Sequence, residues 1–417
     1  MNSNNKILLA ILWPFGALVS ALRNWRQPWA MNVFWVVCIY LGAIQIYHPE
    51  GTLLGDGIDG GRYVMQLMDM HNGNRGLLEQ IAYSFAVSGG MDFYQQILTW
   101  IVSIFTDNGH VLFACFAAVF GFFYSRNMWY VLNRISEPLG WCAIIFLAIL
   151  FLICPIWQIN GVRMWTATHV FVYAILPYIC EGNKKRLLWL IAVPFIHFSF
   201  LYFVVVSAIA VLLPDKFTSN SGIVKWGLVA IFIGSLGLSA VNIPAITNAL
   251  EQFSPDSYQD RIELYTSDTA FERLEAGRTT VNWYVNAASD IQFWVSNILL
   301  LVVALSRLNE VSTRKLLNFA LFISAIANIA SQIPSGGRFL VIAHLFSHSL
   351  IVWQITKLDS QNQLFFKVAK IAAIPLLITL VFGIRSGLDY YGISLFCGNF
   401  LSALFWDNNV PFMNFIK

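Results

Sequence analysis

Long apolar segments make up most of this sequence, and two of them, 143–154 and 293–306, contain no charged residue. The 417-residue chain is 58% hydrophobic and 11% charged, whereas soluble domains have about 25% charged residues. A membrane span needs about 20 apolar residues. The sequence therefore predicts an all-α polytopic membrane protein, with 1–417 as a single integral membrane domain. The net charge of +3 is too small to suggest nucleic acid as a partner.

Eleven apolar segments are long enough to be spans: 7–22, 29–47, 110–131, 139–156, 164–180, 187–213, 223–241, 286–306, 316–332, 339–356 and 366–384. The segment 187–213 is long for one helix and contains Pro194, which favours a break. It either crosses once or returns as two short helices. The sequence thus predicts about 11–12 membrane segments.

The distribution of charge distinguishes these two topologies. With a returning segment and a cytoplasmic 23–28 loop, 15 of the 25 Lys and Arg residues lie inside and 17 of the 22 acidic residues lie outside. With a single crossing, 13 basic residues lie inside. The positive-inside rule therefore favours the returning hairpin. Two polar regions then face outward: 48–109, with an interfacial amphipathic stretch at 77–105 interrupted by Gly89 and Gly90, and the loop 242–285.

Arg62, Arg163 and Arg338 each stand at the mouth of an apolar segment, and all three face outward in this topology. Each is either an interface anchor or a guanidinium fork for phosphate, carboxylate or sugar oxygens. Arg163 follows the turn residues Asn160 and Gly161 and opens a helix. A cation there opposes the helix dipole, so an anion close by would stabilise it.

Three further residues could transfer protons. Asp56 and Asp59 lie in a glycine-rich loop before Tyr63, where they form either a solvated turn or a general base. His197 lies inside an apolar run, so it is either a hydrogen-bonded structural residue or a proton carrier. His344 and His348 are four residues apart without a third ligand at useful spacing, and no metal site or cofactor is expected.

Three short motifs occur in order: Asp59-x-x-x-Tyr63, Asn160-x-x-Arg163 and His197-x-Ser199. Through them the sequence resembles the EpsG-type polysaccharide polymerases, relatives of the Wzy O-antigen and capsule polymerases, over roughly residues 30–400. The resemblance implies a GT-C-like fold in the bacterial cytoplasmic (inner) membrane, with the active site on the outer side. It also implies glycan transfer from polyprenyl pyrophosphate to a sugar hydroxyl of a new lipid-linked repeat unit.

That chemistry assigns expected roles. Arginines would hold the pyrophosphate leaving group in a low-dielectric site, and a base would take the proton of the attacking hydroxyl. The candidate bases are Asp59, Asp56 and His197, in that order. The candidate substrate-binding residues are Arg62, Tyr63, Asn160, Arg163 and Arg338. Expected partners are the polyprenyl-pyrophosphate-linked oligosaccharide and membrane lipid, with a chain-length regulator and a flippase as further candidates.

Other functions stay open. An O-antigen ligase shares nearly all these features. A flippase or transporter would favour inverted repeats and paired broken helices, and one broken segment without duplication is visible. A membrane acyltransferase typically has an acid four residues after its histidine, and none of the seven histidines has one.

Overall fold

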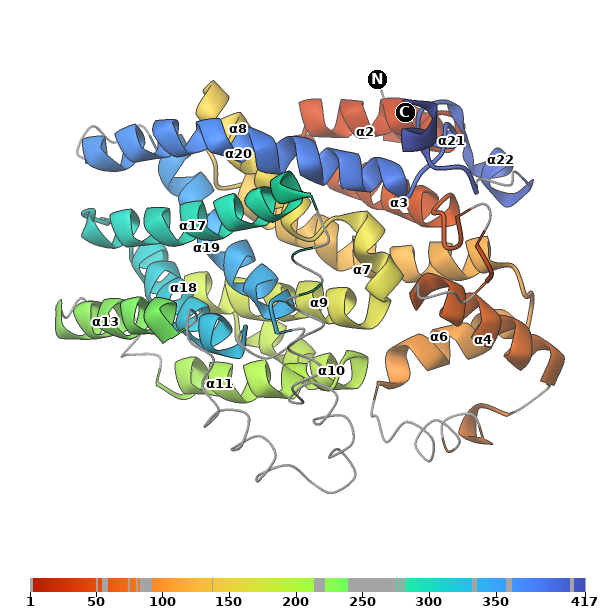
Figure 1. The fold of residues 1–417 in the computed structure, drawn as a ribbon, viewed down its shortest axis with the longest axis horizontal. Helices are drawn as coiled ribbons and strands as arrows, with labels where there is room; N and C mark the ends of the chain where they lie inside the picture. The colour runs from red at the N-terminus through yellow and green to blue at the C-terminus, as the bar shows by residue number, and fades with distance from the viewer. Residues whose placement is uncertain are drawn as a thin grey trace.

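The computed structural model describes residues 3–49, 52–54, 59–73, 76–79, 82, 92–136, 138–213, 222–238, 276, 279, 282–331, 336–357, 362–405 and 409–416. In these residues the structure is helical and contains no strand (Figure 1). Five helical stretches within them are long and apolar enough to cross a membrane: Gly109–Leu132, Trp141–Glu181, Trp283–Leu305, Arg338–Thr356 and Gln363–Asp389. The chain is a polytopic helical membrane protein, as the composition predicts. The likeness to the GT-C fold stays a prediction.

The helices follow one another along the chain in this order: α1 (Ser3–Leu12), α2 (Pro14–Arg23), α3 (Ala30–Ala43), α4 (Asp59–Gly73), α6 (Phe93–Ser103), α7 (Gly109–Leu132), α8 (Trp141–Ile153), η1 (Ile156–Gly161), α9 (Val162–Glu181), η2 (Lys184–Leu188), α10 (Trp189–Ile196), α11 (Phe200–Leu212), α13 (Gly222–Leu238), α17 (Trp283–Leu305), α18 (Val311–Ala330), α19 (Arg338–Thr356), α20 (Gln363–Asp389), α21 (Ser394–Cys397), α22 (Phe400–Phe405) and η5 (Phe412–Phe415). Most of the long helices run roughly along one direction, while α4 and α6 lie together beside one end of the bundle (Figure 1).

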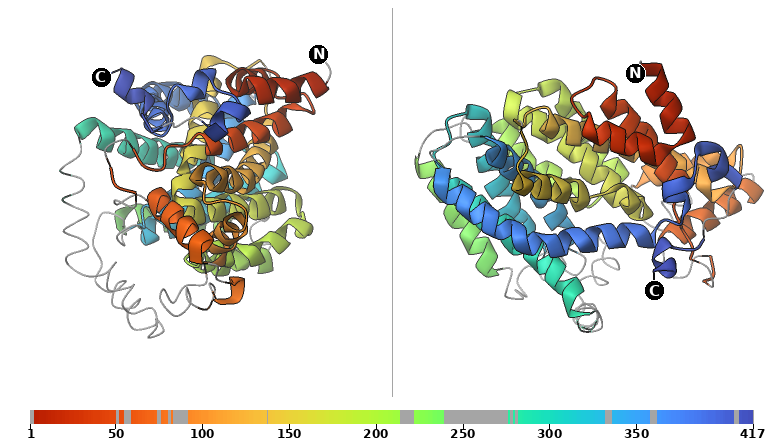
Figure 2. Two further views of the ribbon diagram at one scale, coloured as in Figure 1. Left: turned by 90° about the vertical axis from the view of Figure 1, so that its right-hand side faces the viewer. Right: turned by 90° about the horizontal axis from the view of Figure 1, so that it is seen from above.

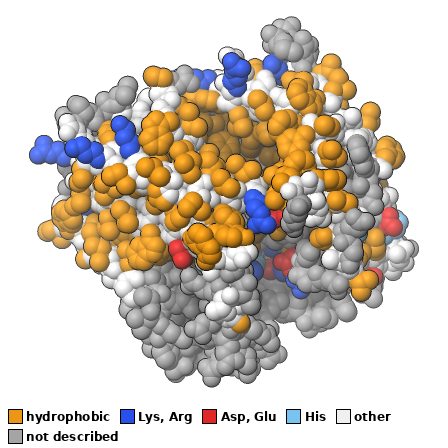
Figure 3. Space-filling model, turned by 45° about the horizontal axis from the view of Figure 1, so that its top comes forward, with side chains coloured by type: hydrophobic (Ala, Val, Ile, Leu, Met, Phe, Trp, Pro, Cys, Tyr) orange, Lys and Arg blue, Asp and Glu red, His pale blue; other side chains and the backbone are white. Residues whose placement is uncertain are grey.

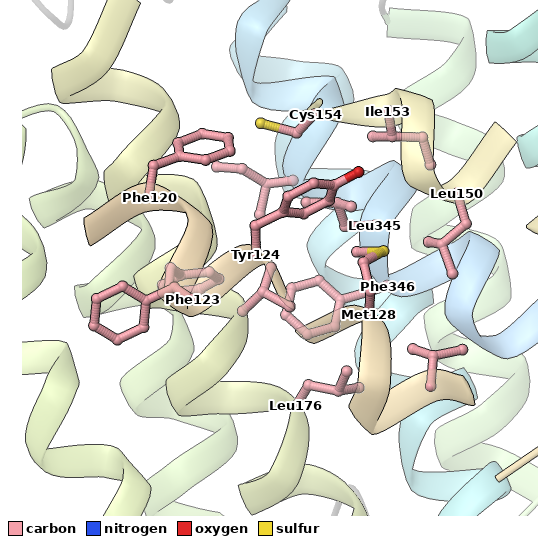
Figure 4. Close-up of a cluster of buried hydrophobic side chains, with 14 of the residues drawn as sticks. Phe120, Phe123, Tyr124, Met128, Leu150, Ile153, Cys154, Leu176, Leu345 and Phe346 are labelled. Carbon is pink, nitrogen blue, oxygen red and sulfur yellow. The ribbon is translucent and has the colours of Figure 1, made fainter. Parts of the chain in front are cut away.

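Aromatic and aliphatic side chains from α7, α8, α9 and α19 fill the centre of the bundle. Figure 4 shows this cluster, which includes Phe120, Tyr124, Leu150, Leu176 and Phe346. Phe120 and Phe346 are fully buried. The Phe120 ring packs on His169 of α9 and the Phe346 ring packs on Phe171 of α9, so α9 lies between α7 and α19 in the bundle.

Ion pairs between helix ends lie at one end of the bundle, which we call the basic end. Arg134 after α7 pairs with Glu181 of α9. Lys357 after α19 pairs with Glu310 before α18 at 2.6 Å. The indole N–H of Trp353 donates to the Val131 carbonyl at 3.1 Å, which joins these two groups. The start of α9, with Arg163, therefore lies at the opposite end.

The segment 187–213 reverses direction, as the distribution of charge predicts. Trp189 in α10 packs on Tyr173 at 6.1 Å between ring centroids, and α10 then runs back toward the start of α9. After the break, Phe200 packs on Phe171 at 6.1 Å. Near the end of α11, the Val211 carbonyl accepts a hydrogen bond from the Tyr178 hydroxyl at 3.2 Å. The break at 197–199 therefore lies at the end opposite the basic end.

The prediction of one span over 7–22 is wrong. The segment forms two short helices, α1 and α2, that fold back on each other beside α3 (Figure 2). The Lys6 ammonium donates to the Ser20 hydroxyl at 3.0 Å, a contact that one straight helix could not make. Pro14 begins α2 as a residue with no backbone N–H to donate. The packing of α1 on α2 places Lys6 close to the 23–28 loop, which begins where α2 ends.

Other expected features are only partly described. The expected amphipathic stretch 77–105 contains α6, whose Gln95 hydrogen-bonds Gln66 of α4 at 2.9 Å. Gly89 and Gly90 lie outside the described residues. So does nearly all of the polar loop expected at 242–285.

The contact between α3 and α7 depends on a glycine. A Cβ atom on Gly42 would lie 2.3 Å from the Ala117 Cβ and 2.5 Å from the Phe113 carbonyl oxygen. We predict that Gly42→Ala lowers the apparent melting temperature of the purified protein, because overpacking typically costs about 1–3 kcal/mol. Gly234→Ala is the matched control, since a Cβ there meets nothing within 4 Å. Equal melting temperatures for both variants would contradict this packing.

Candidate functional site

A buried carboxylate, Asp92, lies at the end of the bundle opposite the basic end. It occupies the N-cap position of α6, yet its side chain makes no capping hydrogen bond to its own helix. The carboxylate points instead toward α9 and the α10–α11 break. Its side chain is 7% exposed. A buried carboxylate needs compensating donors, and neighbouring helices supply them.

Three donors from two other segments meet this carboxylate, forming what we call the Asp92 cluster. Arg163 Nη1 lies 3.0 Å from Asp92 Oδ2, and His197 Nδ1 lies 3.2 Å from the same oxygen. The backbone N–H of Phe198 donates to Asp92 Oδ1 at 2.7 Å. The cluster thus joins α6, the first turn of α9 and the break between α10 and α11.

The local backbone explains why these groups are available. His197 is extended, with φ −151° and ψ 115°, at the C-terminal end of α10, and Ser199 precedes α11. The first N–H groups of a helix lack partners within the helix. The N–H of Phe198, just before α11, is satisfied by Asp92. Arg163 lies in the first turn of α9, where an anion is favourable. Asp92 supplies that anion.

Opposing effects act on the Asp92 carboxyl group. Burial alone would raise its pKa, but the hydrogen bond from His197, the charge of Arg163 and the Phe198 N–H together lower the pKa below its ordinary value. Asp92 is therefore ionised at neutral pH and accepts hydrogen bonds only.

The tautomer of His197 follows from the ionised carboxylate. Because Asp92 can only accept, His197 Nδ1 carries the proton and donates it. In the neutral imidazole the lone pair then lies on Nε2, which has no hydrogen-bond partner in the part of the chain that the structure describes. The His197 side chain is 23% exposed and that of Arg163 is 36% exposed. The cluster thus offers a proton acceptor and a cation to a ligand, with the acid beneath them.

The Asp59 motif lies at the same end but forms a separate pair. Asp59, the first residue of α4, forms an ion pair with Arg62. Their side chains are 36% and 64% exposed, respectively. Tyr63 is 7% exposed and packs on Phe116, with 5.9 Å between ring centroids. Asp56 lies outside the described residues.

Asn160 links this motif to α9. A Cβ on Gly60 would lie 2.2 Å from Asn160 Oδ1, so the start of α4 packs directly on η1. Asn160 Oδ1 is buried and accepts no hydrogen bond from the described residues. The Asp59 and Arg163 motifs are therefore neighbours in the fold, joined by the contact between α4 and η1.

Arg338 stands apart from both groups. It is the exposed first residue of α19. The next residue, Phe339, packs on Phe203 of α11 at 5.0 Å between ring centroids, which places Arg338 at the same end of the bundle. It forms no ion pair or hydrogen bond with the described residues. The structure thus brings Arg163 and His197 together and leaves Arg338 separate.

Asp92 is the site residue that sequence reasoning missed. It lies within the amphipathic stretch 77–105, with no motif around it. One signal was present: Asp92 is the only acidic residue between Glu79 and Asp107, and it lies two residues after the pair Gly89–Gly90. A single acid at the start of an apolar helix could have been matched to the anion that Arg163 requires. Among the described residues, no group of three His, Cys, Asp or Glu side chains could hold a metal ion.

Comparison with known families gives one match. The family model described as "EpsG family" matches residues 51–394, which include Asp59, Asp92, Arg163, His197 and Arg338. Neither the search of curated proteins nor the search of solved structures found a match.

We predict that Asp92→Asn destabilises the protein, because it removes charge-assisted hydrogen bonds that are each worth about 1.5–3 kcal/mol. A lowered folded-state pKa means that this stabilisation is present above the unfolded-state value and is lost as the pH falls through the folded-state pKa. The melting-temperature difference between wild type and variant should therefore persist at pH 5–8 and shrink below about pH 4.

Asp59→Asn is the control for this experiment, since its exposed ion pair contributes only about 0–1 kcal/mol. If Asp92→Asn melted at the wild-type temperature at pH 7, the buried cluster would not contribute to folding.

Proposed function

The chain belongs to the EpsG family, and from this premise we propose that it polymerises lipid-linked oligosaccharide repeat units. Membership supports a polysaccharide-polymerase type of function and a place in polysaccharide biosynthesis. We further propose that the donor glycan is carried on polyprenyl pyrophosphate and that the acceptor is a sugar hydroxyl of another lipid-linked unit. The product would be an O-antigen, capsule or exopolysaccharide.

The observation that carries the proposal is the geometry of His197 in the Asp92 cluster. A carboxylate that fixes Nδ1–H of an imidazole leaves Nε2 as the proton acceptor and stabilises the imidazolium that forms, as in hydrolase triads. Asp92 lies 3.2 Å from His197 Nδ1, which suits that positioning role. We therefore rank His197 ahead of Asp59 as the base, a change from the order that sequence reasoning favours.

The proposed reaction forms one bond and breaks another at the anomeric carbon of the donor glycan. The acceptor hydroxyl oxygen bonds to this carbon, and the bond from the carbon to the pyrophosphate oxygen breaks. The electron pair leaves with the pyrophosphate, and the hydroxyl proton goes to His197 Nε2. Fixed cations in a low-dielectric site stabilise the developing negative charge.

Arg163 is the first candidate for that cation. It is part-exposed beside His197 and is oriented by Asp92. Guanidinium forks bind phosphate oxygens bidentately. Arg338, exposed at the start of α19, and Arg62, paired with Asp59, are proposed to contact the same pyrophosphate or its sugars. Asn160 and Tyr63 are proposed to shape the acceptor side through the contact between α4 and η1.

Asp59 stays the alternative base. Its pairing with Arg62 lowers its availability, because a carboxylate held by a cation is a weaker proton acceptor. A substrate phosphate that binds Arg62 would release it.

Deletion of the protein tests the function, with surface polysaccharide separated on a ladder gel. Loss of the ladder with retention of single-unit material is expected. Loss of all capped material would indicate a ligase or a flippase instead. Complementation with His197→Gln should then lower polymer formation by about 10²–10⁴-fold, the usual contribution of a general base.

Asp59→Asn is the matched comparison in the same strain, and we expect it to retain most polymer. Both variants should reach wild-type amounts in the membrane. If Asp59→Asn abolished polymer while His197→Gln retained it, the base would be Asp59 and the ranking here would be reversed.

We also propose that the Asp92 cluster faces the outer side of the cytoplasmic membrane. The basic end, with Arg134, Lys184, Arg307 and Lys357, would then face the cytoplasm, in agreement with the positive-inside rule. This placement suits a substrate of lipid-linked units that a flippase delivers to the outer leaflet. It also suits a chain-length regulator that acts at the same surface.

Thiol labelling tests the orientation, in a Cys397→Ser background because Cys397 is exposed. Ser267→Cys should react with a membrane-impermeant thiol reagent in whole cells. Asn309→Cys, in the exposed loop at the basic end, should react only after lysis. The reverse pattern would place the Asp92 cluster in the cytoplasm.

A further inference from the structure

An apolar groove lies between α2, α8 and α20. It encloses about 890 Å³, within the roughly 300–1,000 Å³ of typical ligand pockets. Figure 3 shows a largely hydrophobic face with an apolar hollow above its centre. The residues that line the groove are Leu22, Arg23, Trp25, Leu132, Pro138, Leu139, Ile144, Leu147, Ala148, Phe151, Leu152, Leu380 and Ile384. Arg23 is the only charged side chain among them.

The groove runs along one face of α8. Its lining residues from Ile144 to Leu152 follow the helical spacing of a single face, and Leu380 and Ile384 of α20 line the opposite wall. The rise from Ile144 to Leu152 is about 12 Å. Half of a bilayer's hydrocarbon core is about 15 Å thick. The depth of the groove therefore matches the acyl region of one leaflet.

Positive charge gathers where the groove begins. Arg23 is the exposed last residue of α2. Arg26 lies over the Trp25 ring, with 4.6 Å from its guanidinium carbon to the ring centroid. Asn362, just before α20, donates to the Arg307 carbonyl at the basic end at 3.4 Å, so Lys370 lies in the half of α20 nearer this end. The groove thus has a cationic mouth and an apolar wall, the complement of a lipid with an anionic headgroup.

We propose that this groove binds one anionic glycerophospholipid from the leaflet at the basic end, with its phosphate at Arg23 and its acyl chains along α8. This lipid is not the transferred substrate. Arg23 lies at the opposite end of the bundle from Arg163, and α9 alone, Val162–Glu181, spans about 30 Å. The bound lipid joins α2, near the start of the chain, to α20, near its end. The proposal is independent of the polymerase function.

Native mass spectrometry of the purified full chain tests the site, with added dioleoylphosphatidylglycerol or dioleoylphosphatidylcholine as the probe. The wild type should bind one phosphatidylglycerol more tightly than phosphatidylcholine. Arg23→Gln should weaken phosphatidylglycerol binding about fivefold, the effect of one arginine near an anionic headgroup. Phosphatidylcholine binding should be unchanged in this variant.

Arg385→Gln is the matched control, because Arg385 follows Ile384 at the other end of the groove and does not line it. It should bind phosphatidylglycerol like the wild type. Weaker binding in Arg385→Gln and not in Arg23→Gln would overturn the proposed headgroup position. Equal binding of both lipids by the wild type would overturn the anionic preference.

A second pair of variants tests the wall. Ala148→Phe fills the groove and should abolish the retention of both lipids, whereas Ala230→Phe adds the same bulk at an exposed position of α13 and should retain them. If Ala148→Phe retained lipid like Ala230→Phe, the groove would not be the binding site. Arg23→Gln changes only an exposed side chain, so the headgroup test holds even if Ala148→Phe does not fold.

Discussion

The interaction on which the site depends is the burial of one carboxylate beneath a guanidinium and an imidazole side chain. Asp92 is 7% exposed, a position that an unpaired charge could not occupy. Its oxygens are satisfied by Arg163, His197 and the Phe198 N–H. Because these donors come from α9 and from the α10–α11 break, the carboxylate fixes three segments that are distant in sequence. The helix break is therefore a structural requirement of the site.

The same arrangement separates roles among the residues. Its hydrogen-bond donors stabilise the ionised form of Asp92 too strongly for it to be an effective base, since its pKa lies below the ordinary value. It orients the imidazole and the guanidinium, which are the groups exposed to a ligand. A preorganised cation and proton acceptor lower a barrier without reorganising during the reaction. In the proposed mechanism, this division of roles gives a single aspartate outside every recognised motif the same importance as the motif residues.

Much of the architecture could be predicted from sequence because it depends on one-dimensional signals. Apolar length indicated the spans, and the distribution of Lys and Arg favoured the hairpin over 187–213, whose reversal the contacts of Trp189 and Val211 confirm. The same signals failed at 7–22, because apolar length does not distinguish one crossing from two short helices. Asp92 was missed because its importance arises from contacts with Arg163 and His197, which lie 71 and 105 residues away.

The two ends of the bundle are built for different electrostatic environments. At the basic end, cations are paired with Glu181 and Glu310 or remain exposed, as suits an anionic leaflet surface. At the other end, Arg163 is oriented by a buried acid, Asp92. Exposed cations make a surface that attracts anions, whereas a cation held by a buried partner makes a binding site with a fixed geometry. This difference is the physical reason why we propose the chemistry at the Asp92 cluster and membrane-lipid recognition at Arg23.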